Sequence, residues 1–139
     1  MKNTQVLKFT IIALAVVYIV FGFLKVIDKS AVKDMVLTLV PFMKNGYWFQ
    51  VLGIFEIVLG VALVVKKTRL YAATGIILHL LFIFLVSIFG GAVIYSAITF
   101  LTLQGEFVVK NLVLIAAALH IVASEWKGKK LPTISWRFE

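Results

Sequence analysis

Residues 6–26 read VLKFTIIALAVVYIVFGFLKV. The polar interruptions in this stretch are few: Lys8, Thr10, Tyr18 and Lys25. An apolar run of this length can cross the ~30 Å hydrocarbon layer of a bilayer as one helix. A cleaved signal peptide has a shorter apolar region followed by a small-residue cleavage site, and this stretch has neither. We therefore predict a membrane-spanning helix that stays in the mature protein.

The rest of the chain has the same character. Of its 139 residues, 63% are hydrophobic and 14% are charged, whereas soluble domains are roughly half apolar. Three further apolar runs predict spans at about residues 47–65, 70–89 and 106–123. The predicted fold class is all-α, an integral membrane four-helix bundle in which residues 1–139 form a single transmembrane domain.

The segments between the predicted spans are short. From about Asp28 to Val40, charged and apolar residues alternate at helical spacing ahead of Pro41, which predicts a short amphipathic helix on the membrane surface. The apolar segment 92–103 is too short to cross by itself, so we predict a surface or re-entrant element there. The tail after Pro132 is predicted to lie at the membrane interface.

The net charge of +8 bears on topology. The lysines lie in short clusters beside apolar runs, a pattern that indicates orientation in a membrane rather than nucleic-acid binding. Nine lysines and arginines fall at the N-terminus, between the second and third spans and in the C-terminal tail, against five on the other side. The positive-inside rule then predicts that both termini are cytoplasmic. Because the chain has no cysteine, disulfides and thiol chemistry are excluded.

Charged side chains within the spans need a partner or a purpose, since each costs ~2.5 to 3.5 kcal/mol on insertion scales. Glu56 lies near the middle of the second span, and His79 lies at nearly the same depth in the third. A Glu56–His79 pair could be a structural hydrogen bond or could handle protons or bind a ligand. We expect Glu56 to face the bundle interior with His79 as its nearest polar partner. Lys25 and Tyr18 are the next candidates.

Other charged groups fall closer to span ends. Lys25 is predicted to snorkel to the surface, because ~9 Å of helix rise separates it from Glu56. Glu106 and Lys110 have i, i+4 spacing at a helix start, which predicts a self-paired helix end. His120 is predicted to be an interfacial histidine. No metal site is expected, because no spacing repeats a known ligand pattern.

Three short segments carry a resemblance to a known family. They are Phe21-Gly-Phe-Leu-Lys25, Gly53-Ile-Phe-Glu56-Ile-Val-Leu-Gly60 and Gly105-Glu-Phe-Val-Val-Lys110-Asn-Leu. In this order and spacing the chain resembles the DoxX family of small four-span bacterial membrane proteins. The resemblance implies an inner (cytoplasmic) membrane bundle associated with redox complexes, and some relatives are subunits of quinone-linked thiosulfate oxidation. The positions of this chain that match the family's motifs are Gly22, Lys25, Glu56, Gly60, Glu106 and Lys110. The resemblance implies no catalytic mechanism for them.

Three functions are compatible with these features. The first is an accessory subunit that packs against a larger membrane complex, redox or quinone linked, with no enzyme activity of its own. The second is a quinone-linked oxidoreductase component that exchanges protons at Glu56 and His79. The third is a small transporter, for which the spans offer only a thin polar path. No cofactor is required by these features, and quinone is the one candidate; the lipid bilayer and membrane proteins are the expected partners.

Overall fold

The computed structural model describes residues 3–40, 47–89 and 103–128, and these residues fold entirely into helices and short turns. The helices are α1 (Asn3–Val26), α2 (Lys33–Leu39), α3 (Trp48–Val64), α4 (Arg69–Phe89) and α5 (Leu103–Gly128). The all-α prediction is confirmed. The predicted tail element, and all but the last residue of the predicted re-entrant segment, lie outside the described residues.

Helix length and hydropathy make this a multi-pass membrane protein in contact with lipid. Within the described ranges, three helices are long and apolar enough to cross a membrane, at Thr4–Val26, Arg69–Ser87 and Gly105–Trp126. The remaining long helix, α3, is also apolar but has 17 residues. At 1.5 Å per residue it spans ~26 Å, slightly less than the ~30 Å hydrocarbon layer.

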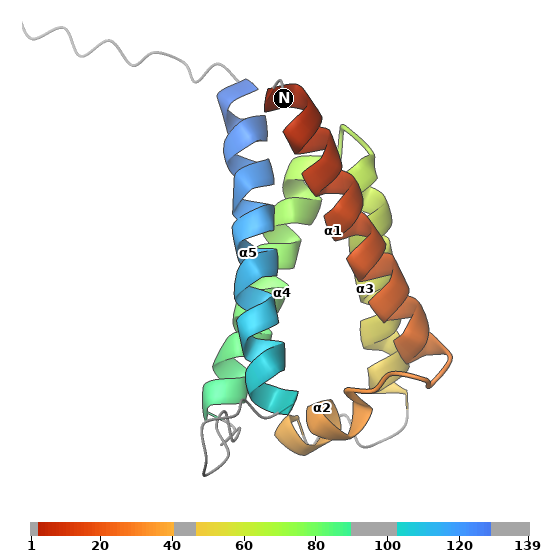
Figure 1. Ribbon diagram of the computed structural model, residues 1–139. Helices are drawn as coiled ribbons and strands as arrows, with labels where there is room; N and C mark the ends of the chain where they lie inside the picture. Colours follow the sequence, from red (N-terminus) through yellow and green to blue (C-terminus); the bar gives the residue numbers. More distant parts are fainter. Residues whose placement is uncertain (1–2, 41–46, 90–102, 129–139) are drawn as a thin grey trace, which may run out of the picture.

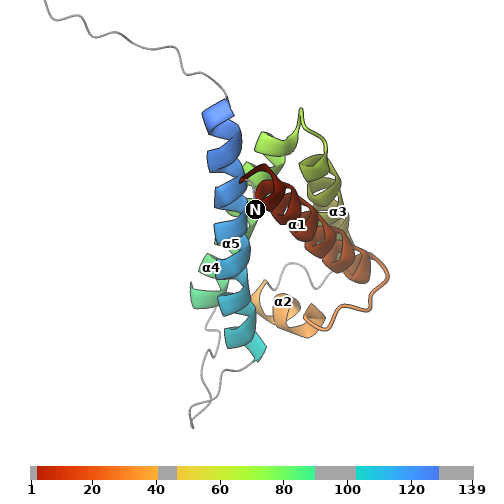
Figure 2. The ribbon, with the colours of Figure 1, turned by 45° about the horizontal axis from the view of Figure 1, so that its top comes forward.

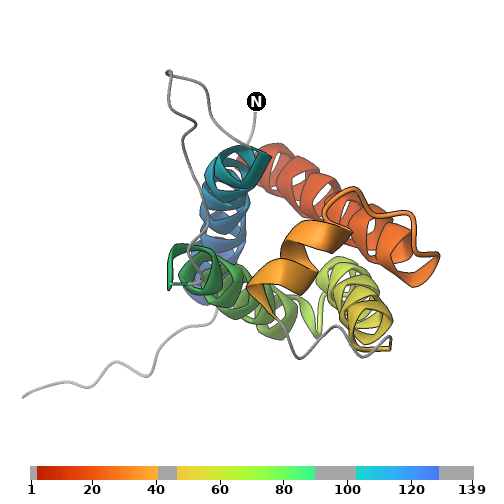
Figure 3. The ribbon, with the colours of Figure 1, turned by 90° about the horizontal axis from the view of Figure 1, so that it is seen from below.

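The four long helices run alternately in opposite directions, and α2 crosses one end of the bundle (Figures 1 and 3). We call this end the α2 end. The start of α1 and the end of α5 lie at the opposite end (Figure 1), and Figure 2 shows the start of α1 beside α5, below the end of that helix. Helix α1 packs against α3 and α5, and α4 packs against the same two helices. The buried core is apolar and draws on all four helices: Ile11, Leu14, Ala15, Tyr18, Leu59, Leu63, Ala72, Ala73, Ile76, Leu80, Ala118 and Ile121.

The closest helix contact joins α1 and α3 through facing glycines. A Cβ atom built on Gly22 would lie 2.5 Å from the Gly53 carbonyl oxygen and 2.9 Å from the Ile57 backbone nitrogen. A Cβ on Gly53 would lie 2.6 Å from the Gly22 carbonyl oxygen. About two helix turns further along α3, a Cβ on Gly60 would lie 3.0 Å from the Ala15 carbonyl oxygen. Small residues at these positions let the two backbones touch, as is common between membrane helices.

Alanine substitutions should separate close contact from ordinary packing. Gly53→Ala places a methyl group against backbone that cannot rotate away, and we expect a loss of ~1 to 3 kcal/mol in the free energy of unfolding. Gly75→Ala is the control, because the nearest atom to its new Cβ is the flexible Leu59 Cδ2 at 3.1 Å. Unfolding by SDS titration in a mild detergent measures both. Equal losses for the two variants would contradict the close-contact account.

The end of α1 is set by a residue with positive φ. Asp28 has φ 59°, a conformation that aspartate tolerates better than most residues. The Lys29 N–H donates to the Leu24 carbonyl at 2.8 Å, and the Asp28 N–H donates to the Lys25 carbonyl at 3.2 Å. This pattern is a Schellman motif, which closes the helix. The chain then turns before α2 can begin.

The predicted surface helix is present but shorter than expected. It was predicted from about Asp28 to Val40, and α2 begins only at Lys33 because the turn at Asp28 belongs to the end of α1. Met35 and Val40 are buried against the bundle, whereas Asp34 is exposed. The amphipathic character of the segment therefore holds over the residues that form the helix.

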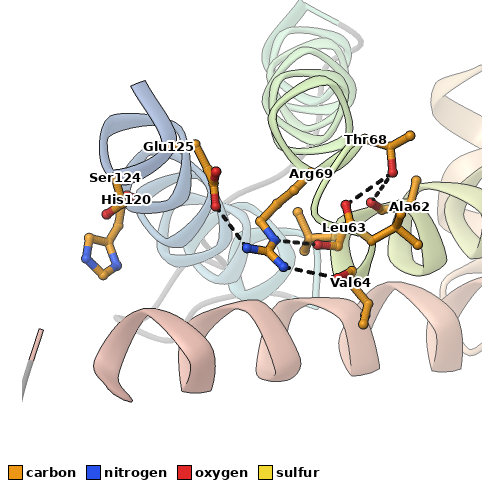
Figure 4. Close-up of polar contacts among 9 residues, drawn as sticks. Ala62, Leu63, Val64, Thr68, Arg69, His120, Ser124 and Glu125 are labelled. Carbon is orange, nitrogen blue, oxygen red and sulfur yellow. Dashed lines mark hydrogen bonds and ion pairs between the residues drawn. The ribbon is translucent and has the colours of Figure 1, made fainter. Parts of the chain in front are cut away.

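At the opposite end of the bundle, Arg69 ties three helices together (Figure 4). Its guanidinium donates to the Leu63 and Val64 carbonyls at the end of α3, both at 3.1 Å, and to Glu125 Oε1 of α5 at 2.9 Å. Thr68 adds a hydrogen bond to the Ala62 carbonyl at 2.8 Å. These donors satisfy carbonyls that the end of α3 leaves without helical partners. The α3–α4 turn is thereby held against α5.

Candidate functional site

A connected set of four buried polar side chains lies inside the bundle, toward the α2 end. We call Lys25, Glu56, His79 and Tyr18 the polar network. The Lys25 ammonium donates to Glu56 Oε2 at 2.6 Å, His79 Nε2 lies 3.7 Å from Glu56 Oε1, and the Tyr18 hydroxyl lies 3.2 Å from His79 Nδ1. None of the four residues is more than 8% exposed. Three helices, α1, α3 and α4, contribute to it.

The prediction that Lys25 snorkels to the surface is wrong. Its side chain is buried in an ion pair with Glu56. Side chains on a helix lean toward its N-terminus, and in this antiparallel pair Lys25 and Glu56 therefore lean toward each other. The glycine contact also sets Lys25 beside Gly53, one helix turn from Glu56. Together these two effects bring the Lys25 ammonium to Glu56 across the ~9 Å difference in helix rise that counting residues gives.

Glu56 faces the interior, but its partners come in a different order from the prediction. Lys25 is in hydrogen-bonding contact with it, whereas His79 Nε2 is beyond hydrogen-bond reach and has no other partner among the described residues. Since Nδ1 faces a hydroxyl and Nε2 faces a carboxylate, a neutral ring with its hydrogen on Nε2 suits both contacts. The Tyr18 hydroxyl then donates to Nδ1. The His79 ring also meets the Phe55 ring edge-on, with centroids 5.6 Å apart.

Two small cavities flank the polar network, and Lys25, Glu56 and His79 line both. The first, of about 50 Å³, lies beneath α2, whose side chains Met35 and Val36 form part of its wall. The second, of about 30 Å³, faces α5. The lining of both is predominantly apolar. The network therefore faces space on two sides rather than being sealed in packed side chains.

Lys110 and Asn111 of α5 line the second cavity. The predicted pairing of Glu106 with Lys110 is wrong. The Lys110 ammonium instead lies 4.8 Å from the centroid of the Phe21 ring and 5.5 Å from that of Phe107. Cation–π contact with two rings, one of them on the neighbouring helix α1, takes the place of the carboxylate.

Asn111 is the residue of this site that sequence reasoning missed. It is 2% exposed, and its Nδ2 has no hydrogen-bond partner within the described part of the chain. The available signal was an amide inside an apolar span, directly after Lys110 in the third resemblance segment. A buried donor without an acceptor costs ~1 to 3 kcal/mol, so it calls for an explanation.

His120 is exposed on α5, with its ring directed away from the Arg69–Glu125 ion pair (Figure 4). Its backbone carbonyl accepts a hydrogen bond from the Ser124 hydroxyl at 2.8 Å. Among the described residues, no group of three or more histidine, aspartate and glutamate side chains could hold a metal ion.

Comparison of the chain with models of known protein families, with curated proteins and with solved structures gave no match.

The ion pair should show strong coupling between its two members. Lys25→Met leaves a buried carboxylate and Glu56→Leu leaves a buried ammonium, so each should lower the free energy of unfolding by ~3 to 5 kcal/mol. Replacing both removes both charges, and the double variant should lose less than either single variant. SDS titration in mild detergent measures all three.

The matched control is Lys33→Met, which breaks the exposed Lys33–Asp28 ion pair at 2.7 Å. Exposed pairs contribute little to stability, so this variant should unfold like the parent protein. Additive losses at Lys25 and Glu56 would show that the two side chains do not depend on each other.

Proposed function

We propose that this chain is a DoxX-like four-span protein of a bacterial inner membrane, an accessory subunit of a larger complex that holds a quinone head beside the polar network. The observation that carries the proposal is a buried ion pair that lines an apolar cavity. Ionisable residues within membrane helices mark functional sites by default. A mostly apolar wall with a few converging polar groups is the usual form of a small-molecule site.

The incompleteness of the network favours ligand binding over a purely structural role. A network that only held helices together would have its hydrogen bonds satisfied, because unpaired buried polar groups are costly. Here His79 Nε2 and Asn111 Nδ2 are both buried without hydrogen-bond partners in the described chain. A quinone carbonyl in the cavity beneath α2 is an acceptor that His79, which lines this cavity, could bind.

The cavity beneath α2 is too small for a quinone ring, so ligand binding requires α2 to move. An engineered cavity of about 150 Å³ accepts benzene, whereas the cavity beneath α2 has about 50 Å³. A quinone ring therefore enters only if α2 moves outward. The helix has seven residues and no side-chain cap at its start, and its Met35 side chain is buried against the bundle. Such a short, weakly anchored helix can act as a movable cover.

Proton exchange at Glu56 and His79 is the second candidate. Lys25–Glu56 and His79–Tyr18 are in hydrogen-bonding contact, and 3.7 Å separates Glu56 Oε1 from His79 Nε2. If that gap closes, the series could deliver protons to a quinone as it is reduced by electrons from the partner complex. Transport has less support. Beyond Tyr18 toward the opposite end, the buried core consists of apolar residues such as Leu14, Leu63 and Ile121.

The quinone proposal predicts a specific loss of bound ligand. Val36→Trp would fill the cavity beneath α2 and should reduce the quinone that co-purifies in mild detergent by about tenfold, ~1.4 kcal/mol. Val58→Trp is the control, because this side chain is 57% exposed on the outer face of α3. Extraction and chromatography quantify the quinone.

Glu56→Gln tests the second candidate. If Glu56 exchanges protons, this variant should keep the bound quinone and lose proton exchange with it.

Two results would count against this proposal. One is a parent protein that carries neither quinone nor partner proteins after gentle purification. The other is a Val58→Trp variant that loses as much quinone as Val36→Trp.

The proposed topology places both termini in the cytoplasm, since nine basic residues stand against five. The four antiparallel helices support an even number of crossings (Figure 1). A reporter active only in the cytoplasm, fused after Glu139, should give signal, and one active only outside should give signal when inserted after Asn45. A silent cytoplasmic reporter at Glu139 would contradict this topology.

A further inference from the structure

The side of the polar network that faces α5 carries features that quinone binding beneath α2 does not use. Asn111 Nδ2 is a buried donor that lines the second cavity and has no acceptor within the described ranges. Lys110 lines the same cavity, and its ammonium contacts two aromatic rings rather than a carboxylate. Lys25 in the same wall is already neutralised by Glu56. Among the described residues, the cavity therefore has one positive charge without a carboxylate partner beside one donor without an acceptor.

A groove on the outside of the bundle adjoins this cavity. It has a volume of about 250 Å³ and lies between α1 and α5, with Phe9 and Ala13 on one wall and Val113 and Ala117 on the other. Val17 and Leu114 line both the groove and the cavity, so the two are neighbours along the same seam. The Thr10 hydroxyl in the groove wall already donates to the Val6 carbonyl at 2.9 Å. The groove is thus suited to hydrocarbon.

The direction of the seam matches that of a lipid in a bilayer. Lys110 and Phe21 lie toward the α2 end, and the groove extends from there toward the opposite end, as far as Ala117 on α5 and Phe9 on α1. From Lys110 to Ala117 the helix rises ~10 Å. An acyl chain beginning at a head group near Lys110 would run inward along this groove, as chains do in one leaflet.

We propose that the α1–α5 seam binds one anionic phospholipid, with its phosphate on the exposed Lys110 at the mouth of the second cavity, one phosphate oxygen directed into that cavity toward Asn111, and one acyl chain in the groove. Charge decides the occupant, because a phosphate oxygen can accept from both the ammonium and the amide, whereas a quinone has no charge to match Lys110. Basic pockets between membrane helices are known to bind lipid head groups. The site is separate from the quinone proposal and does not rest on it.

The test uses the full chain in mild detergent and native mass spectrometry, with phosphatidylglycerol and phosphatidylcholine of identical acyl chains as probes. We expect one phosphatidylglycerol to be retained with about tenfold preference over phosphatidylcholine. Lys110→Gln and Asn111→Leu should each reduce that preference by about tenfold or more. The control is Lys67→Gln, the same charge change at an exposed lysine at the opposite end of the bundle, and it should leave the preference unchanged.

A second variant tests the acyl chain. Ala117→Phe fills the groove without changing charge, so it should lower retention of phosphatidylglycerol. Glycerol phosphate, which has the head chemistry but no chain, should not displace the lipid at equal concentration. The proposal is overturned if both lipids bind equally, if Lys67→Gln has the same effect as Lys110→Gln, or if glycerol phosphate displaces the lipid. It is also overturned if Ala117→Phe, folded like the parent by SDS titration, retains the lipid fully.

Discussion

The backbone contact between α1 and α3 at Gly22 and Gly53 is the constraint on which the rest of this structure depends. It sets Lys25 beside Gly53, one helix turn before Glu56. The Lys25 ammonium therefore reaches Glu56 Oε2, at 2.6 Å, inside the bundle. A larger residue at either glycine would push the helices apart and leave two charges buried without each other, which is among the costliest defects a membrane protein can carry.

The ion pair also divides the molecule into two halves with different properties. Toward the start of α1, the bundle interior is an apolar core, and the Arg69–Glu125 ion pair lies at that end of the bundle. Toward α2 the interior holds the polar network and two cavities. The buried polar groups and the two cavities therefore lie toward one end of the described bundle. For the proposed quinone site, this arrangement favours entry from one leaflet over a path through the protein.

The long helices and the amphipathic α2 could be predicted because their signals are local, namely runs of apolar residues and helical spacing of charges. The errors concern contacts between helices. Lys25 was predicted at the surface because residue counting ignores the lean of side chains and the depth at which two glycines meet. The expected Glu106–Lys110 pair fails because Phe21, on another helix, offers Lys110 a face that no local rule includes. Asn111 was missed because its burial follows from packing alone.

The claim most worth testing is that Lys25 and Glu56 form a direct ion pair in a bilayer. Solid-state NMR of the protein in lipid, with ¹⁵N in lysine and ¹³C in glutamate, measures coupling between the Lys25 ammonium nitrogen and the Glu56 carboxyl carbon. The account predicts a strong cross-peak from this pair, absent in Lys25→Met. A Lys25 ammonium that couples to water and lipid head groups, with no cross-peak to Glu56, would contradict it.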